Sequence, residues 1–505
     1  MGFSFEVKES DLLGRIGSLK VGGKSLETPY LFPVIHPVDQ QVPTEELKRM
    51  GFGGLMTNSY IIYSRRKDEA LLEGIHKMLG FDGVFITDSG GYQVLEYGNL
   101  DVDYSAIASF QSGIGSDVAV TLDKPTGYPQ TRLRAKETVE YSLKNAIATM
   151  DEFGDSKTVW VGPIQGGLHL DLVRKSAQAL VKRGFRFLAL GSPVQVMENY
   201  MFADLVRMIV AARDELPYSA PLHLFGAGHP LTMALAVALG CDTFDSASYV
   251  IFARTGRYMT REGVMTLQSM KYLPCNCRVC ANTNVRALLE LDHKEMVKLL
   301  SIHNLLTLKA ELDACKEAIV EGRLWDLVEE RSMAHPRLRE AFVELSRFSN
   351  VLSVGTPAMK DKGLFVRSAE DLRRPEVQGA ASRLERSIRR SSNRSVLLVR
   401  DEKGRTRANL TKTPMSPKSQ DTYILHPVFG PYSSELEFVY PFSQTEVGAA
   451  EHSFSLAAAK KTLKRWGYKT VQVATPSKNE LVKIRSRRSR RGASPSLRSS
   501  SARPR

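Results

Sequence analysis

Two aspartates that follow short apolar runs are the residues of this chain best suited to chemistry. The first is Asp88, which opens the segment Asp88-Ser-Gly-Gly-Tyr-Gln93. Glycines let backbone approach a flat heterocycle, an aromatic ring such as Tyr92 can stack on it, and a carboxylate can manage its protons. We therefore predict that this loop binds a flat ring and that Asp88 acts on its protons.

The second aspartate, Asp245, stands in Phe244-Asp-Ser-Ala-Ser-Tyr249 at the end of another apolar run. Two carboxylates that face one pocket can divide glycosidic chemistry between them. One attacks the anomeric carbon, and the other handles the proton of the leaving group. Because a pocket for a flat ring lies beside the pair, the leaving group that this pattern implies is a nucleobase.

A cluster of three cysteines predicts a metal site. Cys275, Cys277 and Cys280 lie within six residues of one another, and histidines follow at His293 and His303. Three thiolates and one histidine make a closed tetrahedral zinc site with a structural role, because no position stays open for water. We favour His303 as the fourth ligand, with His293 as its competitor. The alternative is a reduced cysteine cluster without metal.

The elements that must position these residues form a regular alternation of strands and helices. Eight short apolar runs read as strands: Tyr30–Val34, Gly54–Thr57, Gly83–Thr87, Val118–Leu122, Val159–Ile164, Phe187–Leu190, Leu222–Phe225 and Thr243–Phe244. Helical patterns between them make the strands parallel. This predicts an α/β fold, a (β/α)8 TIM barrel, with an open doubly wound sheet as the alternative.

Polar residues recur directly after the predicted strands, which supports the barrel. They are Asp88, Asp123, Gln165, Gly191 and Asp245. Functional groups of such barrels gather at the C-terminal ends of the strands, so these residues are expected to share one site.

The length of the chain calls for a large catalytic unit with additions. We predict a barrel with a zinc-binding insertion over residues 1–346, the zinc subdomain covering about 270–346. Residues 5–28 resemble an N-terminal hairpin around a Gly-Gly turn. A smaller accessory α+β domain is predicted over residues 350–480, and a basic disordered tail over 483–505.

The net charge of +14 is concentrated in the last third of the chain. Residues 483–505 carry nine Lys/Arg and no acid, and residues 360–412 carry fifteen against seven Asp/Glu. Such a surface favours a large polyanionic partner, and the alternative is a solvated surface with a disordered tail. No apolar run reaches the roughly 18 residues of a membrane span, and no signal peptide is recognisable, so we predict a cytoplasmic protein.

Four motifs in this order resemble the tRNA-guanine transglycosylases: Asp88-Ser-Gly-Gly-Tyr-Gln93, Gly162-Pro-Ile-Gln-Gly-Gly167, Phe244-Asp-Ser-Ala-Ser-Tyr249 and the Cys-x-Cys-x2-Cys…His set. The resemblance covers about residues 10–345. It implies exchange of a guanine in tRNA for a 7-deazaguanine through a covalent ribosyl–aspartate intermediate. By position it makes Asp245 the nucleophile and Asp88 the general acid/base. Asp123 and Gln165 would recognise the base edge, Gly191 would supply a backbone contact, and Tyr92 would stack.

Other segments are similar to archaeal members of that family, namely Gly226-Ala-Gly-His-Pro230 and His426-Pro-Val-Phe-Gly-Pro431. Bacterial relatives usually place Gly-Glu after the sixth strand, whereas this chain has Gly191-Ser192-Pro193. Removing that carboxylate fits a neutral cyano group better than a cation. The resemblance therefore implies 7-cyano-7-deazaguanine (preQ0) as the incoming base and the D-arm guanine of archaeal tRNA as the target, on the route to archaeosine.

Several alternatives stay open at this point. The same chemistry could act on the anticodon wobble guanine or on DNA, and a non-catalytic tRNA-binding subunit or a zinc-dependent RNA-binding module are rivals of another class. Both aspartates are present, which argues against the non-catalytic subunit and against the RNA-binding module. The family's usual C-terminal RNA-binding module is not recognisable here, so either a separate polypeptide supplies it or the basic tail and residues 360–412 act instead. The resemblance also implies a homodimer.

Overall fold

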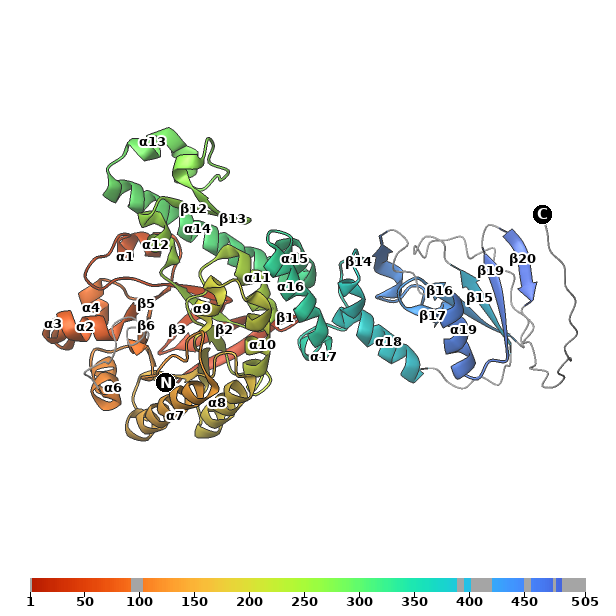
Figure 1. Ribbon diagram of the computed structural model, residues 1–505, viewed down its shortest axis with the longest axis horizontal. Coiled ribbons are helices and arrows are strands. Elements are labelled where there is room, and N and C mark those ends of the chain that lie inside the picture. Colours follow the sequence, from red (N-terminus) through yellow and green to blue (C-terminus); the bar gives the residue numbers. More distant parts are fainter. Residues whose placement is uncertain are drawn as a thin grey trace, which may run out of the picture. The chain divides into compact units, whose positions relative to one another are not determined.

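The computed structural model describes residues 2–91, 103–387, 395–400, 420–448, 456–475 and 478–483. Tyr92 and all of the predicted tail except Lys483 lie outside the described residues. The chain divides into two compact units (Figure 1). One consists of Met1–Lys362 with Glu370–Gly379, and the other of Gly363–Ala369 with Ala380–Arg505.

A barrel of eight parallel strands forms the centre of the first unit. The strands are β4 (Tyr30–Pro33), β5 (Gly54–Asn58), β6 (Val84–Asp88), β7 (Val118–Val120), β8 (Val159–Ile164), β9 (Phe187–Leu190), β10 (Leu222–Leu224) and β11 (Thr243–Ser246). They pair in the order β4-β11-β10-β9-β8-β7-β6-β5. A parallel bridge between Val34 and Met56 joins the two ends of this sheet. The predicted barrel is confirmed, and the ends of all eight predicted strands are placed within two residues.

Helices between the strands cover the outside of the barrel (Figure 1). They are α1 (Thr44–Arg49), α2 (Ser59–Arg65), α3 (Lys67–Glu73), α4 (Ile75–Leu79), α6 (Tyr104–Gly113), α7 (Arg132–Phe153), α8 (Leu170–Arg183), α9 (Pro193–Glu198), α10 (Phe202–Arg213) and α11 (Pro230–Ala238). Local signals set their ends: the Thr131 side chain accepts a hydrogen bond from the Arg134 N–H at the start of α7, and Gly184 ends α8 in the left-handed region. The largest hydrophobic core lies between these helices and the strands.

The N-terminal segment is a three-stranded antiparallel sheet, not only the hairpin that we predicted. β2 (Gly14–Val21) and β3 (Lys24–Thr28) make that hairpin, and β1 (Ser4–Asp11) adds a strand to it. The sheet shares one hydrophobic cluster with barrel residues that begin their strands, and the cluster includes Phe3, Leu19, Val21, Leu26, Val84, Val118 and Phe187. The sheet therefore closes the N-terminal end of the barrel and leaves the other end for a site.

A mainly helical segment follows the last barrel strand. It contains α12 (Ser248–Arg254), the hairpin of β12 (Arg257–Thr260) and β13 (Gly263–Thr266), α13 (Val285–Glu290), α14 (His293–Val320), α15 (Leu324–Ser332), α16 (Pro336–Leu345) and α17 (Ser349–Leu352). Buried Asn304 on α14 ties the segment together, because its amide donates to the carbonyl of Tyr249 at 3.1 Å and accepts from the N–H of Met259 at 2.9 Å. The predicted zinc segment is thus anchored directly to the chain that follows Asp245.

Two of the basic residues counted in the predicted basic surface are buried in the first unit. Lys360 donates to the carboxylates of Asp11 at 2.7 Å and Glu376 at 2.6 Å, and Arg374 donates to Asp326 at 3.1 Å. All five of these side chains are at most 4% exposed. Their charges are neutralised inside the protein, so these two cations do not belong to a surface for a polyanion.

The second unit is a mixed α/β assembly. Its five-stranded sheet has the order β17-β16-β15-β19-β20, and β14 (Leu364–Val366) pairs with β18 (Thr445–Val447) in a separate pair. The sheet strands are β15 (Ser395–Arg400), β16 (Gln420–His426), β17 (Gly430–Ser433), β19 (Thr470–Thr475) and β20 (Lys478–Lys483). α18 (Pro375–Ser387) begins in the first unit and ends in the second, and α19 (Leu456–Arg465) packs on the sheet. Over the described residues, no helix has the length and apolarity to cross a bilayer.

Candidate active site

A cavity of about 1100 Å³ opens at the C-terminal ends of the barrel strands. The predicted site residues that line it are Asp88, Asp123, Gln165, Gly191 and Asp245, from the ends of five different strands. The structure thus brings together every predicted residue of the pocket that lies among the described residues. Tyr92, the predicted stacking ring, lies outside them.

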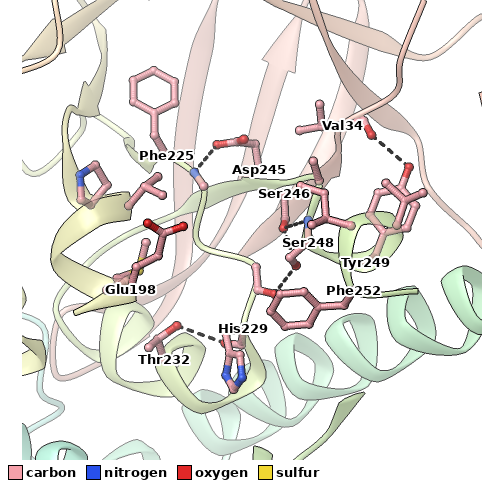
Figure 2. A pocket seen from close by; sticks show the side chains of 18 of the residues that line it. Val34, Glu198, Phe225, His229, Thr232, Asp245, Ser246, Ser248, Tyr249 and Phe252 are labelled. Carbon is pink, nitrogen blue, oxygen red and sulfur yellow. Dashed lines mark hydrogen bonds between the residues drawn. The ribbon is translucent and has the colours of Figure 1, made fainter. Parts of the chain in front are cut away.

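One oxygen of Asp245 is held and the other is not. Its Oδ1 accepts a hydrogen bond from the N–H of Gly226 at 2.8 Å (Figure 2) and lies 3.0 Å from Nε2 of His223. When Asp245 is ionised and His223 is a neutral imidazole, His223 donates from Nε2, and its Nδ1 accepts from the hydroxyl of Thr243 at 3.0 Å. Oδ2 accepts no hydrogen bond from the described residues, so it is the oxygen available to a reacting atom.

His223 was missed by the sequence reasoning. It lies in the middle of β10 and is 2% exposed. The sequence does contain a sign of its role: a histidine interrupts the otherwise apolar run of the predicted strand. What the sequence did not show is that a neighbouring strand places the Asp245 carboxylate within hydrogen-bond distance.

Asp88 has the electrostatics of a proton carrier. Burial is the largest cause, and together with the negative charges of Asp123 and Asp245 it raises the pKa of this carboxyl to about 7. Its Oδ2 accepts from the Asn58 amide at 3.1 Å and from the N–H of Gly90 at 3.3 Å. A carboxyl group with a pKa near 7 can both donate and accept a proton near neutral pH.

Asn58, which the sequence reasoning also missed, fixes the orientation of Asp88. Its Oδ1 accepts from the N–H of Ile61 at 2.9 Å and caps α2. The cap uses Oδ1, whereas Nδ2 of the same amide donates to the carboxylate. One residue therefore begins a helix and orients the acid.

A hydrogen-bonded chain orients the pair that was predicted to recognise the base. The Gln165 amide donates from Nε2 to Asp123 Oδ2 at 2.7 Å. Its Oε1 accepts from the hydroxyl of Ser192 at 2.8 Å and from the N–H of Thr126 at 3.0 Å, which sets the direction of the amide. Burial raises the pKa of Asp123 to about 6, while the hydrogen bond from Gln165 opposes this shift.

Gly91 and Gly191 make room for protein side chains, whereas the sequence pattern predicts that glycines of the site let backbone approach the ligand. A Cβ at Gly91 would stand 2.2 Å from Oδ1 of Asp123, and a Cβ at Gly191 would stand 2.2 Å from Nε2 of Gln165. The N–H of Gly191 already donates to the carbonyl of Ile164 at 2.8 Å. A backbone contact from Gly191 to a base would therefore have to use its carbonyl oxygen.

The cysteine cluster forms a group that could hold a metal ion. The ligand atoms of Cys275, Cys277, Cys280 and His303 all lie within 4.8 Å of one another. His303 faces the thiols with Nδ1, at 3.4 Å from Cys280 Sγ, while its Nε2 lies 2.9 Å from the Met259 carbonyl. A metal-binding histidine is commonly oriented by such a bond at its other nitrogen. Three sulfurs and one nitrogen fit a closed tetrahedral site.

The competing histidine, His293, lies at the start of α14 and outside this group. Its Nε2 is 3.2 Å from the carbonyl of Arg254.

A metal ion bound by this cluster is expected to be lost when one thiol is replaced. Cys280→Ser should lower the metal content from about one ion per chain to near zero and lower Tm by on the order of 10 °C, since a structural metal stabilises only the folded state. Elemental analysis and thermal melting measure both effects. Cys315→Ser, in a buried cysteine outside the cluster, should keep the metal even if it loses stability. A Cys280→Ser protein with its full metal content would contradict the assignment.

The fold and the cavity define a (β/α)8 protein that gathers carboxylates at the C-terminal ends of its strands, where enzymes of this fold have their active sites. Comparison with known proteins agrees with this class of protein and identifies the family. The family model described as queuine tRNA-ribosyltransferase matches residues 10–337.

Similar relatives share most of the chain. The tRNA-guanine(15) transglycosylase of Sulfolobus acidocaldarius is 36% identical over 478 residues, which cover 93% of this chain and 94% of the relative. That of Thermococcus onnurineus is 39% identical over 88% of this chain and 71% of the relative, and that of Aeropyrum pernix is 40% identical over 75% and 74%. The chain belongs to the tRNA-guanine transglycosylase family and is a pentosyltransferase, of the class that exchanges a guanine base in tRNA.

Proposed function

We propose that this enzyme replaces the guanine at position 15 of tRNA with 7-cyano-7-deazaguanine through a covalent ribosyl–aspartate intermediate, on the route to archaeosine. The observation that carries the chemistry is the pairing of Asp245, fixed through Oδ1 only, with Asp88, whose pKa is near 7, in one cavity. The position of the target guanine rests on the names of the relatives.

In the first half of the proposed reaction, Oδ2 of Asp245 attacks C1′ of the target nucleoside. The bond between C1′ and N9 breaks, its electron pair leaves with the guanine, and protonated Asp88 supplies the proton that the departing base needs. Gly226 and His223 hold Oδ1 in place during the attack. The products are free guanine, a ribosyl ester of Asp245 and ionised Asp88.

The second half reverses these roles. The incoming base gives its N9 proton to the Asp88 carboxylate and attacks C1′ with the freed electron pair. The ester bond breaks, and Asp245 leaves as a carboxylate. Atoms and electrons balance over the two halves, and no oxidant or reductant is needed.

Base recognition in this proposal uses the edge that guanine and 7-deazaguanines share. Its N1–H and amino group can donate to the Asp123 carboxylate, and its O6 can accept from Nε2 of Gln165. Tyr92 is proposed to stack on the ring. Ser192 places no charge beside the position of the 7-substituent, in agreement with a neutral cyano group, although Glu198 of α9 also lines the cavity (Figure 2).

Zinc is the metal that we propose for the cysteine cluster, because three thiolates and one imidazole suit it. When bound, it would supply a structural clamp between the segment of Cys275–Cys280 and α14. We also propose tRNA as the macromolecular partner and the cytoplasm as the location. The homodimer and a separate RNA-binding polypeptide remain predictions.

The proposal is tested with an unmodified tRNA transcript and isotope-labelled 7-cyano-7-deazaguanine. Label should enter the transcript, and nuclease mapping should place it at position 15. A transcript with adenine at that position should take up none, whereas one with a changed wobble base should be a full substrate. Label confined to the wobble position would overturn the target, and binding without any exchange would favour the non-catalytic subunit.

A further inference from the structure

The turn between α9 and α10 holds a tyrosine where helix ends usually have glycine or asparagine. Tyr200 has φ of 56°, in the left-handed region. Its N–H donates to the carbonyl of Met197 and the next N–H, of Met201, donates to that of Val196, both at 3.0 Å. This is the Schellman pattern, in which a bulky residue at the left-handed position is disfavoured. Tyr200 is 52% exposed, so burial does not compensate for the conformation.

A second ring lies at a helix N-cap, a position where a smaller polar residue could also accept the hydrogen bond. His335 is the N-cap of α16, and its Nδ1 accepts from the N–H of Arg337 at 3.1 Å. Ser, Thr, Asp or Asn is usual at such a cap. The rings of His335 and Tyr200 stack with centroids 4.9 Å apart and an interplanar angle of 25°. Two segments far apart in the chain thus place aromatic rings face to face, and the cap fixes one of them.

This Tyr200–His335 platform belongs to the wall of the candidate active site. Both residues line the cavity that contains Asp88 and Asp245, and so does Phe202, whose ring meets the Tyr200 ring edge-on with centroids 5.7 Å apart. The half-exposed tyrosine therefore presents apolar, flat surface at the wall of the cavity.

We propose that the Tyr200–His335 platform stacks a nucleobase of tRNA that neighbours the nucleotide entering the cavity. The proposal rests on the proposed function, since a base that is exchanged must leave its stack and deprive its neighbour of a partner. Aromatic side chains replace such lost stacking without selecting a base, because every base has a π-face. The free incoming base has the same chemistry, and the test separates the two sources.

Asparagine substitutions remove each ring while suiting the local backbone. Tyr200→Asn keeps a residue that tolerates the left-handed region, and His335→Asn keeps a helix cap. Each should raise KM for a tRNA transcript at least about fivefold, leave KM for the free base within about twofold, and leave Tm unchanged or higher. Tyr200→Phe should restore the wild-type KM. Tyr141→Asn, in an exposed tyrosine of α7 that does not line the cavity, is the control and should change neither constant.

Direct titration of the same transcript separates the platform from the catalytic proposal. Weaker binding by Tyr200→Asn supports the platform even if the wild-type protein exchanges no base. Unchanged tRNA affinity and KM in both asparagine variants would overturn the platform and leave the catalytic proposal standing. A rise confined to KM of the free base would assign the rings to that base and overturn the proposal, as would a wild-type protein that does not bind the transcript.

Discussion

Asp245→Asn is expected to abolish the covalent adduct with tRNA and to lower base exchange by at least about 10⁴-fold, because it removes the nucleophile of the proposed reaction. Asparagine is nearly isosteric, and its Oδ1 can still accept from the N–H of Gly226 and from His223. The pocket should therefore keep its shape and its affinity for tRNA. Only the charge and nucleophilicity of the free oxygen are lost.

The adduct is measured by denaturing gel electrophoresis after the enzyme is mixed with end-labelled tRNA. Asp39→Asn is a matched control, since Asp39 is another carboxylate that lines the cavity, paired with Arg254 at 3.1 Å. This control should form the adduct at close to the wild-type level. An undiminished adduct in Asp245→Asn would refute the assignment of the nucleophile.

The barrel and the cluster of its strand-end residues could be predicted because both depend on local patterns. Short apolar runs with intervening helical periods define parallel strands, and the strand ends then fall at one edge. The same logic placed Asp88 and Asp245 in one cavity before any distance was known. The division between β1 and β2 was not predicted because the turn there holds Leu12 and Leu13 in place of the residues that usually mark a turn.

The remaining parts of the site depend on contacts between distant residues. His223 became a partner of Asp245, and Asn58 a partner of Asp88, only through the pairing of neighbouring strands. The surroundings of individual charges depend on such contacts as well. Lys360 contributed to the predicted basic surface, yet the fold buries it between two carboxylates. A sequence shows how many charges a segment has, but not which of them are neutralised.

Asp88→Asn is expected to lower kcat by about 10²- to 10⁴-fold, the usual contribution of a general acid or base. The substitution should also remove the pH dependence of kcat/KM for tRNA. In the free enzyme the pKa of Asp88 is raised to about 7, so the proton needed by the departing guanine is lost as the pH rises through that value. The kcat/KM for tRNA should therefore fall above about pH 7 in the wild type, and this limb should be absent in Asp88→Asn.

The raised pKa of Asp88 also affects the free energy of unfolding. Because the folded pKa of Asp88 lies above its ordinary value of 3.8, the folded state binds more protons than the unfolded state between that value and about 7. The free energy of unfolding therefore falls as the pH rises through this interval. Asp88→Asn should make this fall smaller, which chemical denaturation at a series of pH values measures.

Formation of the covalent intermediate should shift the pH dependence of the second half-reaction to lower pH. Once Asp245 is an ester it has lost its negative charge, which in the free enzyme helps to raise the pKa of Asp88. The kcat/KM for the incoming base needs ionised Asp88, so it should rise with pH, with a midpoint below 7. Asp123→Asn should keep both limbs, displaced to lower pH, because it removes a second charge that raises the same pKa. If Asp88→Asn instead retained the limb near pH 7, another group would carry the proton.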